Sequence, residues 1–564
     1  METRIIECVP NFSEGRDPEK IKQITDAICS VKSIKLLDVD PGEATNRTVV
    51  TFVGAPEDVV EAAFRGIRKA AEVIDMRQHH GAHPRMGATD VCPLIPVAGV
   101  TLEECAELSR ALAKRVADEL HIPTYCYEAA AFRPERKNLA VCREGEYEAL
   151  SRKMGDEEKG PDFGNRPFDE DAARTGATTI GARDFLIAVN YNLNTTSTRR
   201  ANAIAFDVRE KGRPMREGGK VTGKPVKDAD GKPVMIPGTL KGTKAIGWFI
   251  DEYGIAQVSM NITDIAHVPL HVAFDEVCKK ADERGVRVTG TEIVGLIPKR
   301  TLIDAGKYFL RKQHRSVGIP EEEIIRIAVK SMGLDELKPF DPREKVIEYL
   351  IEDTSKKKLI DLTARGLAEE TASESPAPGG GSISAYMGAL GAALGTMVAN
   401  LTAHKAAYDD RWEEFSDVAE EGQNLMDQLL FLVDEDTEAF NRIMDVFAMP
   451  KKTDEEKAAR AQAMEDATLY ATQVPLRTME TAFKVFPLLR KMVDDGNQSS
   501  ITDAGVGTLA VRAAIRGAFL NVKINAAGLK DRAKAEELIA RGAEIEAEAA
   551  RLESEILADV NAKI

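Results

Sequence analysis

Residues 46–74, NRTVVTFVGAPEDVVEAAFRGIRKAAEVI, decide the class of the N-terminal fold. Residues 46–54 carry the β-branched and aromatic side chains that are typical of a strand. From residue 56 to residue 74 the apolar side chains recur with the spacing of an amphipathic helix. A strand that passes directly into a long helix indicates an α/β fold.

The same alternation extends on both sides of this stretch and predicts one domain over residues 1–180. We expect strands at 5–10, 34–40, 89–97 and 124–127, and helices at 17–30 and 102–120. The core order is βαββαβ, an α/β sandwich with helices on one face of a mainly antiparallel sheet.

Residues 181–336 repeat that order as a second sandwich subdomain. Strands are expected at 185–193, 245–253, 255–263 and 286–295, and helices at 198–210, capped by Ser197, and 270–284. Two copies of one small sandwich would leave a cleft between them, a common place for a ligand. The Gly- and Lys-rich insert at 211–242 is expected to be an exposed hairpin or flap.

The composition changes after a charged, Pro-containing linker at 337–358. Residues 359–564 have little strand signal and a succession of amphipathic patterns, which predicts an all-α helical bundle closing with residues 530–561. Residues 382–402 carry no charge and are long enough to cross a bilayer. Because they are rich in Gly and Ala, we expect a buried helix and no membrane span.

The totals exclude some classes of function. The formal net charge of −16 argues against a general nucleic-acid or anionic-membrane binder. The seven cysteines are odd in number and show no CxxC pair, which indicates reduced thiols in a cytoplasmic protein. The first residues lack the basic and then apolar pattern of a signal peptide.

The loop HHGAHPRMG at 79–87 is the densest cluster of reactive side chains. His79 and His83 have the spacing of a helical zinc pair, but Gly81 and Pro84 interrupt a helix and no HExxH glutamate follows, so no metal is expected. One loop histidine acting in proton transfer fits better. The alternative is that these are surface histidines without a role.

Other polar residues follow the ends of predicted strands. Taken singly they are turn or cap residues, and together they would surround one cleft; they are Asn11, Glu14, Asp38, Asp40, Asn46 and Arg47. The Gly-rich run at 160–185 either presents backbone amides and Arg183 to an anionic or heteroaromatic ligand or is a plain linker.

In the helical half, the Gly-rich loop Gly379, Gly380, Gly381 runs into a helix that begins at about Ser382. Such a loop offers amides to an anion or permits a tight turn, and it is not a P-loop. Asp434 and Asp436 are two residues apart, so one is expected to face a site and the other solvent or a cap. Asp503 lies in an expected break between helices, where it is either functional or an N-cap.

The motifs CVPNFSEG, LLDVD, NRTVVTFVG, HPRMGATDVCP and GARDFLIAVNYNL closely resemble the formiminotransferase family of histidine degradation, over residues 1–330. The resemblance implies transfer of a formimino group from N-formimino-L-glutamate to nitrogen 5 of tetrahydrofolate, with His83 as the catalytic histidine. It implies folate binding by the segment 164–176, including Gly164, Asn165 and Gly176. Asp40 would orient the histidine or steady the cationic amidine. Arg85 and Arg183 would anchor carboxylates, and Asn11, Asp38 and Arg47 complete the expected binding set.

The motifs APGGGS, LGTMVANLT, LVDEDTEAF and the region DAGVG…AFLNVKIN are similar to the cyclodeaminase domain, over about residues 355–564. This implies closure of nitrogen 10 onto the formimino carbon with release of ammonia, giving 5,10-methenyltetrahydrofolate. The catalytic aspartate would be Asp436, with Asp434 in support. The expected binding residues are Gly379, Gly380, Gly381, Ser382, Lys405 and Asp503. The pair His404-Lys405 departs from the family's glycine-plus-base pattern.

Together the two resemblances predict a bifunctional transferase and lyase. Its expected partners are N-formimino-L-glutamate, polyglutamylated tetrahydrofolate as cosubstrate, and further copies of the chain that associate through the helical domains; no nucleic acid and no metal are expected. Two alternatives stay open. The helical domain acts as a methenyltetrahydrofolate cyclohydrolase, or one half is a non-catalytic folate-binding or assembly module.

Overall fold

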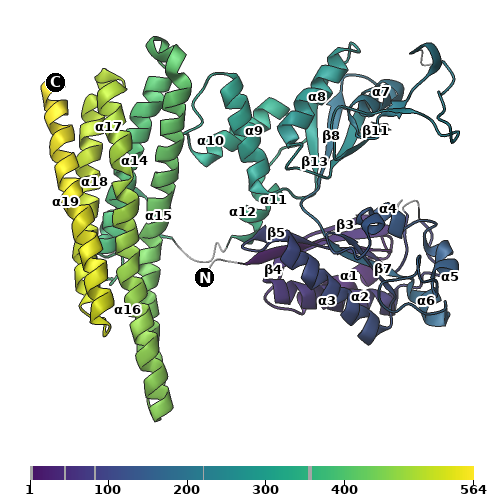
Figure 1. The fold of residues 1–564 in the computed structure, drawn as a ribbon, viewed down its shortest axis with the longest axis horizontal. Coiled ribbons are helices and arrows are strands. Elements are labelled where there is room, and N and C mark those ends of the chain that lie inside the picture. Colours follow the sequence, from purple (N-terminus) through teal and green to yellow (C-terminus); the bar gives the residue numbers. More distant parts are fainter. Residues whose placement is uncertain (1–3, 44–45, 82–83, 220–221, 353–357) are drawn as a thin grey trace. The chain divides into compact units, whose positions relative to one another are not determined.

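A computed structural model describes residues 4–43, 46–81, 84–219, 222–352 and 358–564. The chain divides into two compact units (Figure 1). The first, the α/β unit, comprises Met1–Thr301 and Met332–Glu352, and the second, the helical unit, comprises Leu302–Ser331 and Asp353–Ile564. The predicted succession of α/β domains and a largely helical region is confirmed. All seven cysteines are free thiols.

The first half of the α/β unit is built on one mixed sheet. Its strands, in order across the sheet, are β3 (Lys35–Gly42), β4 (Arg47–Gly54), β1 (Ile5–Cys8) continued by β2 (Asn11–Phe12), β5 (Thr89–Ala98), β7 (Thr178–Ala182) and β6 (Thr124–Glu128). The pairs β5–β7 and β7–β6 are parallel and the others antiparallel. The sheet therefore has more strands than a simple βαββαβ sandwich, because β6 and β7 extend it at one edge.

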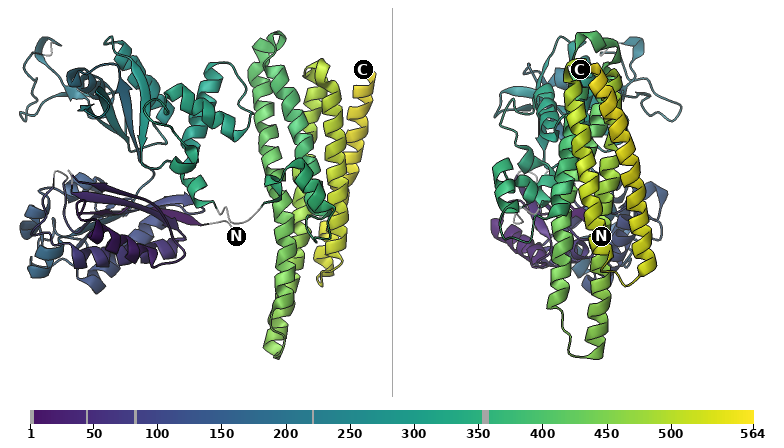
Figure 2. Two further views of the ribbon diagram at one scale, coloured as in Figure 1. Left: turned by 180° about the vertical axis from the view of Figure 1, so that it is seen from behind. Right: turned by 90° about the vertical axis from the view of Figure 1, so that its left-hand side faces the viewer.

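Three helices cover one face of this sheet: α1 (Pro18–Cys29), α2 (Pro56–Val73) and α3 (Leu102–Leu120) (Figures 1 and 2). Phe12, Val50 and Phe52 point into the core beneath them and are at most 1% exposed. The opposite face is partly covered by short helices, which pack around Tyr125 and Tyr127. These are η1 (Pro134–Lys137), α4 (Leu139–Cys142), η2 (Tyr147–Ala149), α5 (Leu150–Lys153) and α6 (Glu170–Thr175).

The second half of the α/β unit contains a four-stranded antiparallel sheet in the order β11-β12-β8-β13. Its elements are β8 (Ile187–Leu193), α7 (Thr198–Val208), β11 (Thr243–Ile250), β12 (Ile255–Ile262), α8 (Leu270–Asp282) and β13 (Val288–Val294). Ser197 caps α7, as predicted, by accepting the amide of Arg200. The insert forms a hairpin of β9 (Arg213–Pro214) and β10 (Met235–Ile236), with η3 (Glu217–Gly219) between them.

The boundary between the units differs from the predicted one at residue 336. Part of α9 (Lys299–Lys312) and of α10 (Glu321–Met332), with the loop between them, belongs to the helical unit. The reason is close packing: a Cβ on Gly318 would lie 2.1 Å from the backbone of Ala419, and the amide of Val317 donates to Ser416 Oγ. The predicted linker contains α11 (Pro342–Lys345) and α12 (Ile347–Ile351), which belong to the α/β unit.

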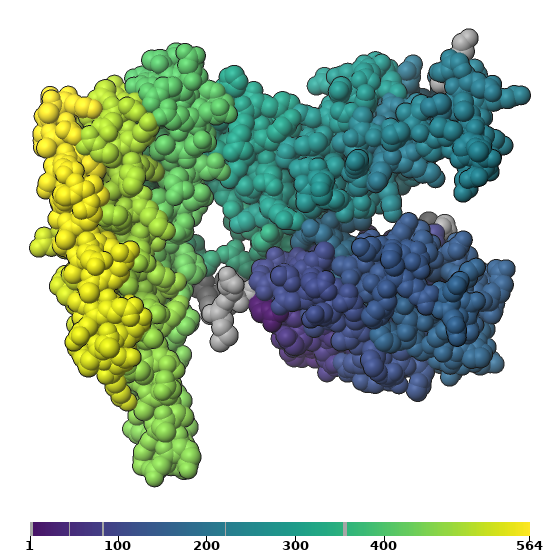
Figure 3. Space-filling model, viewed as in Figure 1, coloured from purple at the N-terminus to yellow at the C-terminus, as the bar shows by residue number. Residues whose placement is uncertain are grey.

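The helical unit packs around α14 (Gly380–Ala403), which lies against α15 (Trp412–Ala448) and α18 (Ile501–Ala526). The other helices are η4 (Leu359–Asp361), α13 (Ala364–Thr371), η5 (Ala406–Arg411), α16 (Asp454–Phe483), α17 (Val485–Asp495), η6 (Gln498–Ser500) and α19 (Arg532–Lys563). The ends of α15 and α16 project beyond their neighbours (Figure 3).

Within the described residues α14 is the one helix long and apolar enough to cross a membrane, and 61% of its apolar window is buried. A Cβ on Gly391 would lie 2.6 Å from Val511, and one on Gly395 would lie 2.3 Å from Leu488. Small residues thus allow α14 to pack closely against its neighbours, which agrees with the predicted buried helix.

Candidate active sites

The first residues of the histidine loop, His79 and His80, are held against the first sheet by Asn46. The Asn46 side chain accepts the amide of Gly15 at 3.0 Å and donates to the backbone oxygen of His80 at 3.0 Å. His79 is buried, and its Nε2 donates to the backbone oxygen of Asn46 at 2.8 Å. Burial lowers the pKa of His79. These contacts give His79 a structural role, while His83, the predicted catalytic histidine, lies outside the described residues.

A buried ion pair that the sequence did not reveal lies directly after this loop. Asp90, at the start of β5, is fully buried, accepts the amide of Met86 at 2.9 Å and forms an ion pair with Arg143. Burial raises the pKa of Asp90, while the Arg143 and Arg47 guanidinium groups act in the opposite direction. The pair fixes the chain that leaves the histidine loop. The one indication of this ion pair in the sequence was an acidic residue, Asp90, at the start of an apolar strand.

Four of the six predicted residues at strand ends share one face of the first sheet. Asn11 and Asp40 both pair with Val49, and Asp38 pairs with Thr51 two residues further along β4. Because side chains alternate along a strand, Asn11, Asp38, Asp40 and Arg47 point to the side opposite α1, α2 and α3. We call this side the open face.

Two of these charged groups have shifted pKa values. Burial and the neighbouring charge of Asp40 raise the pKa of Asp38. Burial lowers the pKa of Arg47, which the charges of Asp90 and Asp40 oppose. The open face therefore combines carboxylates, an amide and a guanidinium.

Arg85 and Asn165, two other predicted binding residues, form contacts within the protein that give them a structural role. Arg85 is 12% exposed in its side chain and forms ion pairs with Glu146 at 3.2 Å and Glu148 at 2.7 Å, so it is not an open carboxylate anchor. Asn165 accepts the amide of Gly155 and donates to the backbone oxygen of Asp156, closing its own loop.

The glycines of this predicted folate segment also meet protein atoms. Gly176 forms a bridge with Gly87, and a Cβ there would lie 2.1 Å from the backbone oxygen of Met86. Gly164 has a φ of 68° and lies against Ala117 and Pro123. Both positions require glycine for the fold itself.

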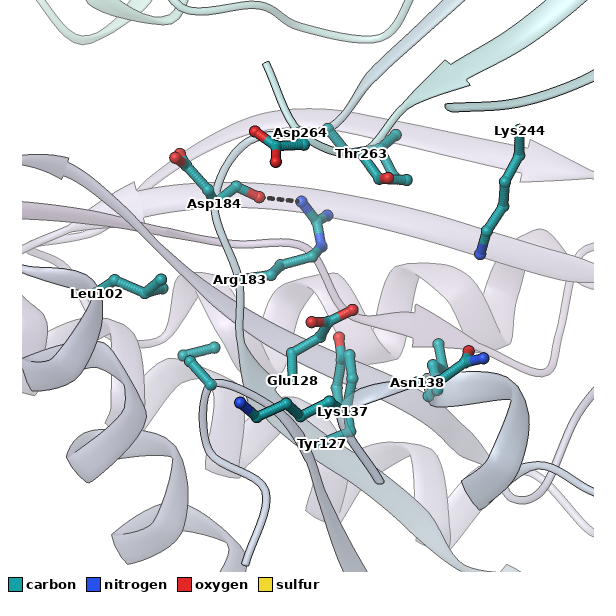
Figure 4. Close-up of a pocket in the computed structure, with 14 residues that line it drawn as sticks. Leu102, Tyr127, Glu128, Lys137, Asn138, Arg183, Asp184, Lys244, Thr263 and Asp264 are labelled. Atoms are coloured by element: carbon teal, nitrogen blue, oxygen red, sulfur yellow. Dashed lines mark hydrogen bonds between the residues drawn. The ribbon is translucent and has the colours of Figure 1, made fainter. Parts of the chain in front are cut away.

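Arg183 lines a cavity of about 490 Å³ within the α/β unit (Figure 4). Its guanidinium donates to the backbone oxygen of Asp184 at 3.0 Å. The charged side chains of this cavity have both signs: Lys137, Arg183 and Lys244 against Glu128, Asp184 and Asp264. Arg183 lies seven positions after Gly176 of the Gly87–Gly176 bridge, so at about 3.3 Å per residue the chain between them spans up to about 23 Å.

A further buried carboxyl, also missed in the sequence, lies on the open face. Glu7 in β1 pairs with Val53 and is 4% exposed. Burial raises the pKa of Glu7 to about 7, and the charge of Arg183 partly opposes this shift. Its signal in the sequence was one acidic residue in the middle of an apolar strand.

The second site is centred on Asp436 in α15. Asp436 Oδ2 accepts the amide of Ser382 at 2.9 Å and the Ser382 hydroxyl at 3.2 Å, at the first turn of α14. Burial raises the pKa of Asp436, and the Ser382 hydrogen bonds oppose this. A Cβ on Gly381 would lie 2.1 Å from Asp436 Oδ1, so only glycine allows the carboxylate to approach the helix end.

A cavity of about 150 Å³ lies beside this carboxylate. The glycine loop, α15 and α18 form its walls through Gly379, Gly380, Gly381, Asp436, Thr437, Asn521 and Asn525. The glycine loop thus meets the predicted aspartate. The two asparagines lie in the AFLNVKIN motif at 518–525, but the sequence analysis named neither as a site residue.

Asp434 diverges from Asp436, as the spacing predicted. Its carboxylate accepts the amide of Leu359 at 2.6 Å, and burial raises its pKa. Asp434 therefore caps the segment that enters the helical unit, and it does not line the cavity.

Lys405 and Asp503 are not brought to this cavity within one chain. Lys405 follows the far end of α14 and donates to Asn497 at 2.7 Å. Asp503 lies in the first turn of α18 instead of in a break between helices. The 18 residues from Asp503 to Asn521 correspond to about 27 Å of helix, so both predicted binding residues lie at the opposite end of the bundle.

Comparisons with known proteins match three successive segments of the chain, and the second of these includes residues 302–331 of the helical unit. The sequence model of the formiminotransferase domain, N-terminal subdomain, matches residues 5–183, that of the formiminotransferase domain matches 188–352, and that of formiminotransferase-cyclodeaminase matches 363–544. The chain is 41% identical to formimidoyltransferase-cyclodeaminase of Mus musculus over 530 residues, 94% of each chain. It belongs to the formiminotransferase-cyclodeaminase family.

Two shorter relatives each match one part of this family member. Glutamate formimidoyltransferase of Thermoplasma acidophilum is 41% identical over 309 residues, covering 54% of this chain and 92% of its own. Methenyltetrahydrofolate cyclohydrolase of Methylorubrum extorquens is 42% identical over 193 residues, covering 34% of this chain and 93% of its own.

Proposed function

We propose that the chain is a bifunctional folate enzyme of histidine degradation. It transfers the formimino group from N-formimino-L-glutamate to tetrahydrofolate and then cyclises 5-formiminotetrahydrofolate to 5,10-methenyltetrahydrofolate with release of ammonia. The observation that carries the proposal is the match to formimidoyltransferase-cyclodeaminase over 94% of the chain. The matched segments at 5–183 and 188–352, and the one at 363–544, then correspond to the two reactions.

In the transferase half, His83 takes the proton of nitrogen 5 and returns it to the departing glutamate nitrogen. Asp40 on the open face steadies the cationic amidine. Tetrahydrofolate is elongated, so it extends from the open face toward the cavity of Arg183. There Arg183 binds a carboxylate and Lys137 and Lys244 bind the anionic polyglutamate tail.

In the cyclodeaminase half, Asp436 moves the proton. Its raised pKa favours a carboxylate that takes a proton from nitrogen 10 and gives it to the leaving amine. Ser382 holds one carboxylate oxygen through two hydrogen bonds, which leaves the other oxygen beside the cavity.

An absorbance assay for the methenyl product, together with an ammonia assay, tests both steps. The full chain receives tetrahydrofolate and N-formimino-L-glutamate. His83→Ala should lose transfer and Asp436→Ala should accumulate 5-formiminotetrahydrofolate. His80→Ala and Asp434→Asn are the matched controls and should keep both steps. Folate binding without transfer by the wild-type chain would refute the proposal.

The cyclohydrolase relative supports a second candidate for the helical unit. In that case the chain would hydrolyse 5,10-methenyltetrahydrofolate faster than it releases ammonia from the 5-formimino compound. Supplying each folate separately to the wild-type chain decides between the two.

We also propose that copies of the chain associate through the helical unit. The neighbouring helices α14 and α18 expose large apolar side chains, among them Leu390, Leu401, Val506, Leu520 and Ile524. Ile524 is 72% exposed. Burial of such a surface favours self-association. Ile524→Lys should lower the molar mass measured by light scattering, and an unchanged mass would contradict this interface.

A cytoplasmic location completes the proposal. Five of the seven free cysteines are buried and none forms a disulfide, which suits a reducing compartment. Fractionation of cells that express the chain tests this location, and recovery in a secreted fraction would contradict it.

A further inference from the structure

Two asparagines of α18 converge on the cavity beside Asp436. Asn521 and Asn525 are four residues apart, so they lie one above the other on the same side of the helix. Both line the cavity that Asp436 and Thr437 line from α15. The mechanism described above gives neither asparagine a role.

The hydrogen bonds of the two amides fix their orientation. Asn521 Nδ2 donates to the backbone oxygen of Gly517 at 3.0 Å, and Asn525 Nδ2 donates to that of Ala471 at 2.7 Å. A flipped amide would place its oxygen against a backbone oxygen. In the described part of the chain neither Oδ1 has a donor, and both side chains are partly exposed. The carbonyl oxygens are therefore the atoms available to a ligand.

Among the polar side chains that line this cavity, Asp436, Asn521 and Asn525 present acceptor oxygens, and Thr437 presents a hydroxyl. A formimino group ends in a protonated nitrogen with N–H donors, whereas a formyl group ends in an oxygen that can only accept. Hydrogen bonds to a charged donor are stronger than neutral ones. Acceptor oxygens at these positions can accept the N–H hydrogens of a formimino group, whereas they would repel the oxygen of a formyl group.

We propose that Asn521 and Asn525 bind the exocyclic nitrogen of the formimino group and so select an amidine over a formyl group. This inference rests on the proposed cyclodeaminase function. Nitrogen 10 attacks the formimino carbon, a carbon–nitrogen bond forms, and the electron pair of the C=N bond moves to the exocyclic nitrogen. Asp436 takes the proton from nitrogen 10 and gives it to the exocyclic amine. The bond from that amine to carbon then breaks, and ammonia leaves with the bonding pair.

The two asparagines act throughout this step on the group that departs. Their oxygens accept the N–H hydrogens of the amidinium and of the amine that forms from it. Asp436 is then free to move the single proton that the reaction transfers. The methenyl product retains the one positive charge of the amidinium.

The test measures the ammonia-forming step with 5-formiminotetrahydrofolate, which the Asp436→Ala variant is expected to accumulate, and inhibition of that step by 5-formyltetrahydrofolate. Asn521→Ala should lower kcat/KM by about ten- to a hundredfold, the loss of a hydrogen bond to a charged group. Inhibition by the formyl compound should stay equal or become stronger. Lys523→Ala, on the same helix and exposed, is the matched control and should behave as wild type.

Asn525→Ala should show the same change in selectivity, even though it also loses the contact to α16. An equal loss for the formimino and formyl compounds in Asn521→Ala would overturn the inference, because it would indicate a damaged cavity. A kcat/KM equal to that of the wild-type chain in both Asn521→Ala and Asn525→Ala would overturn the inference as well. In either case, ammonia release by the wild-type chain would leave the proposed function standing, whereas absence of that release would refute the function itself.

Discussion

Replacing Glu7 by glutamine is expected to stabilise the first sheet at alkaline pH and to have little effect in acid. Glu7 is 4% exposed in the middle of β1, where burial raises the pKa of its carboxyl from 4.5 to about 7. Arg183 lowers that pKa and Glu348 raises it, but both effects are smaller than that of burial. The folded chain therefore holds the proton more tightly than the unfolded chain does.

The sign and size follow from the two pKa values. A raised folded-state pKa gives stability that is fully present below pH 4.5 and is lost as pH rises through 7. The folded-state pKa of about 7 lies 2.5 above the ordinary pKa of 4.5. At about 1.4 kcal/mol per pKa unit, ionisation of Glu7 lowers the free energy of unfolding by about 3 kcal/mol at pH 8. Glutamine cannot ionise, so Glu7→Gln should gain about 3 kcal/mol over wild type at pH 8 and about 1 kcal/mol at pH 5.5.

Hydrogen exchange followed by mass spectrometry measures this locally. Peptides that cover β1 and its partners β4 and β5 should exchange more slowly in Glu7→Gln than in wild type at pH 8, after correction for the intrinsic rate. The difference should shrink at pH 5.5. Glu107→Gln, at an exposed position of α3, is the control. A Glu7→Gln effect that is the same at both pH values would refute the reasoning, because it would reflect packing and not ionisation.

Three further predictions concern the helical unit. Gly381→Ala should reduce ammonia release at least tenfold and spare transfer, because its Cβ would lie 2.1 Å from the Asp436 carboxylate; the coupled assay measures both. Asp434→Ala should lower the free energy of unfolding by about 1 kcal/mol, the cost of a half-buried amide without its acceptor, and keep ammonia release per folded chain. His404 accepts the backbone amide of Ser316, and burial lowers the pKa of its imidazole. The contribution of neutral His404 to the free energy of unfolding should therefore be complete above pH 6.5 and be lost as pH decreases through that lowered pKa. Urea unfolding at pH 5.5 and 8 tests this, since His404→Gln should lose that part of the pH dependence.

Local pattern was enough to predict most elements and the shared face of four candidate residues. The alternation of side chains along β2, β3 and β4 places Asn11, Asp40 and Arg47 on one face, and the period of two residues is visible in the sequence. The divergence of Asp434 and Asp436 follows in the same way from helical geometry.

Contacts between distant segments were beyond such reasoning. Asp90 and Arg143 are 53 residues apart, and nothing in either segment indicates the other. The packing of Gly318 against α15 moved the boundary between the units, because one missing side chain allows a contact that composition does not reveal. The sequence placed the segments around Ser382 and Asp503 in one site. Each lies at the start of its own helix, α14 or α18, and because the two helices are antiparallel, these starts lie at opposite ends of the bundle.

The antiparallel packing of α14 and α18 explains why Asn521 and Asn525 line the cavity beside Asp436 and Asp503 does not. Gly380 lies beside Asn521, Gly388 beside Ala514, and Gly391 beside Gly507, so the start of one helix meets the end of the other. The glycine loop at the start of α14 must therefore find its partners near the end of α18, where the predicted Asp503 cannot reach. The residues that do reach it are polar, one turn apart and oriented by their own backbone hydrogen bonds. If the antiparallel direction of α18 had been known, Asn521 and Asn525 would have been expected at this cavity in place of Asp503, without any information about the chemistry.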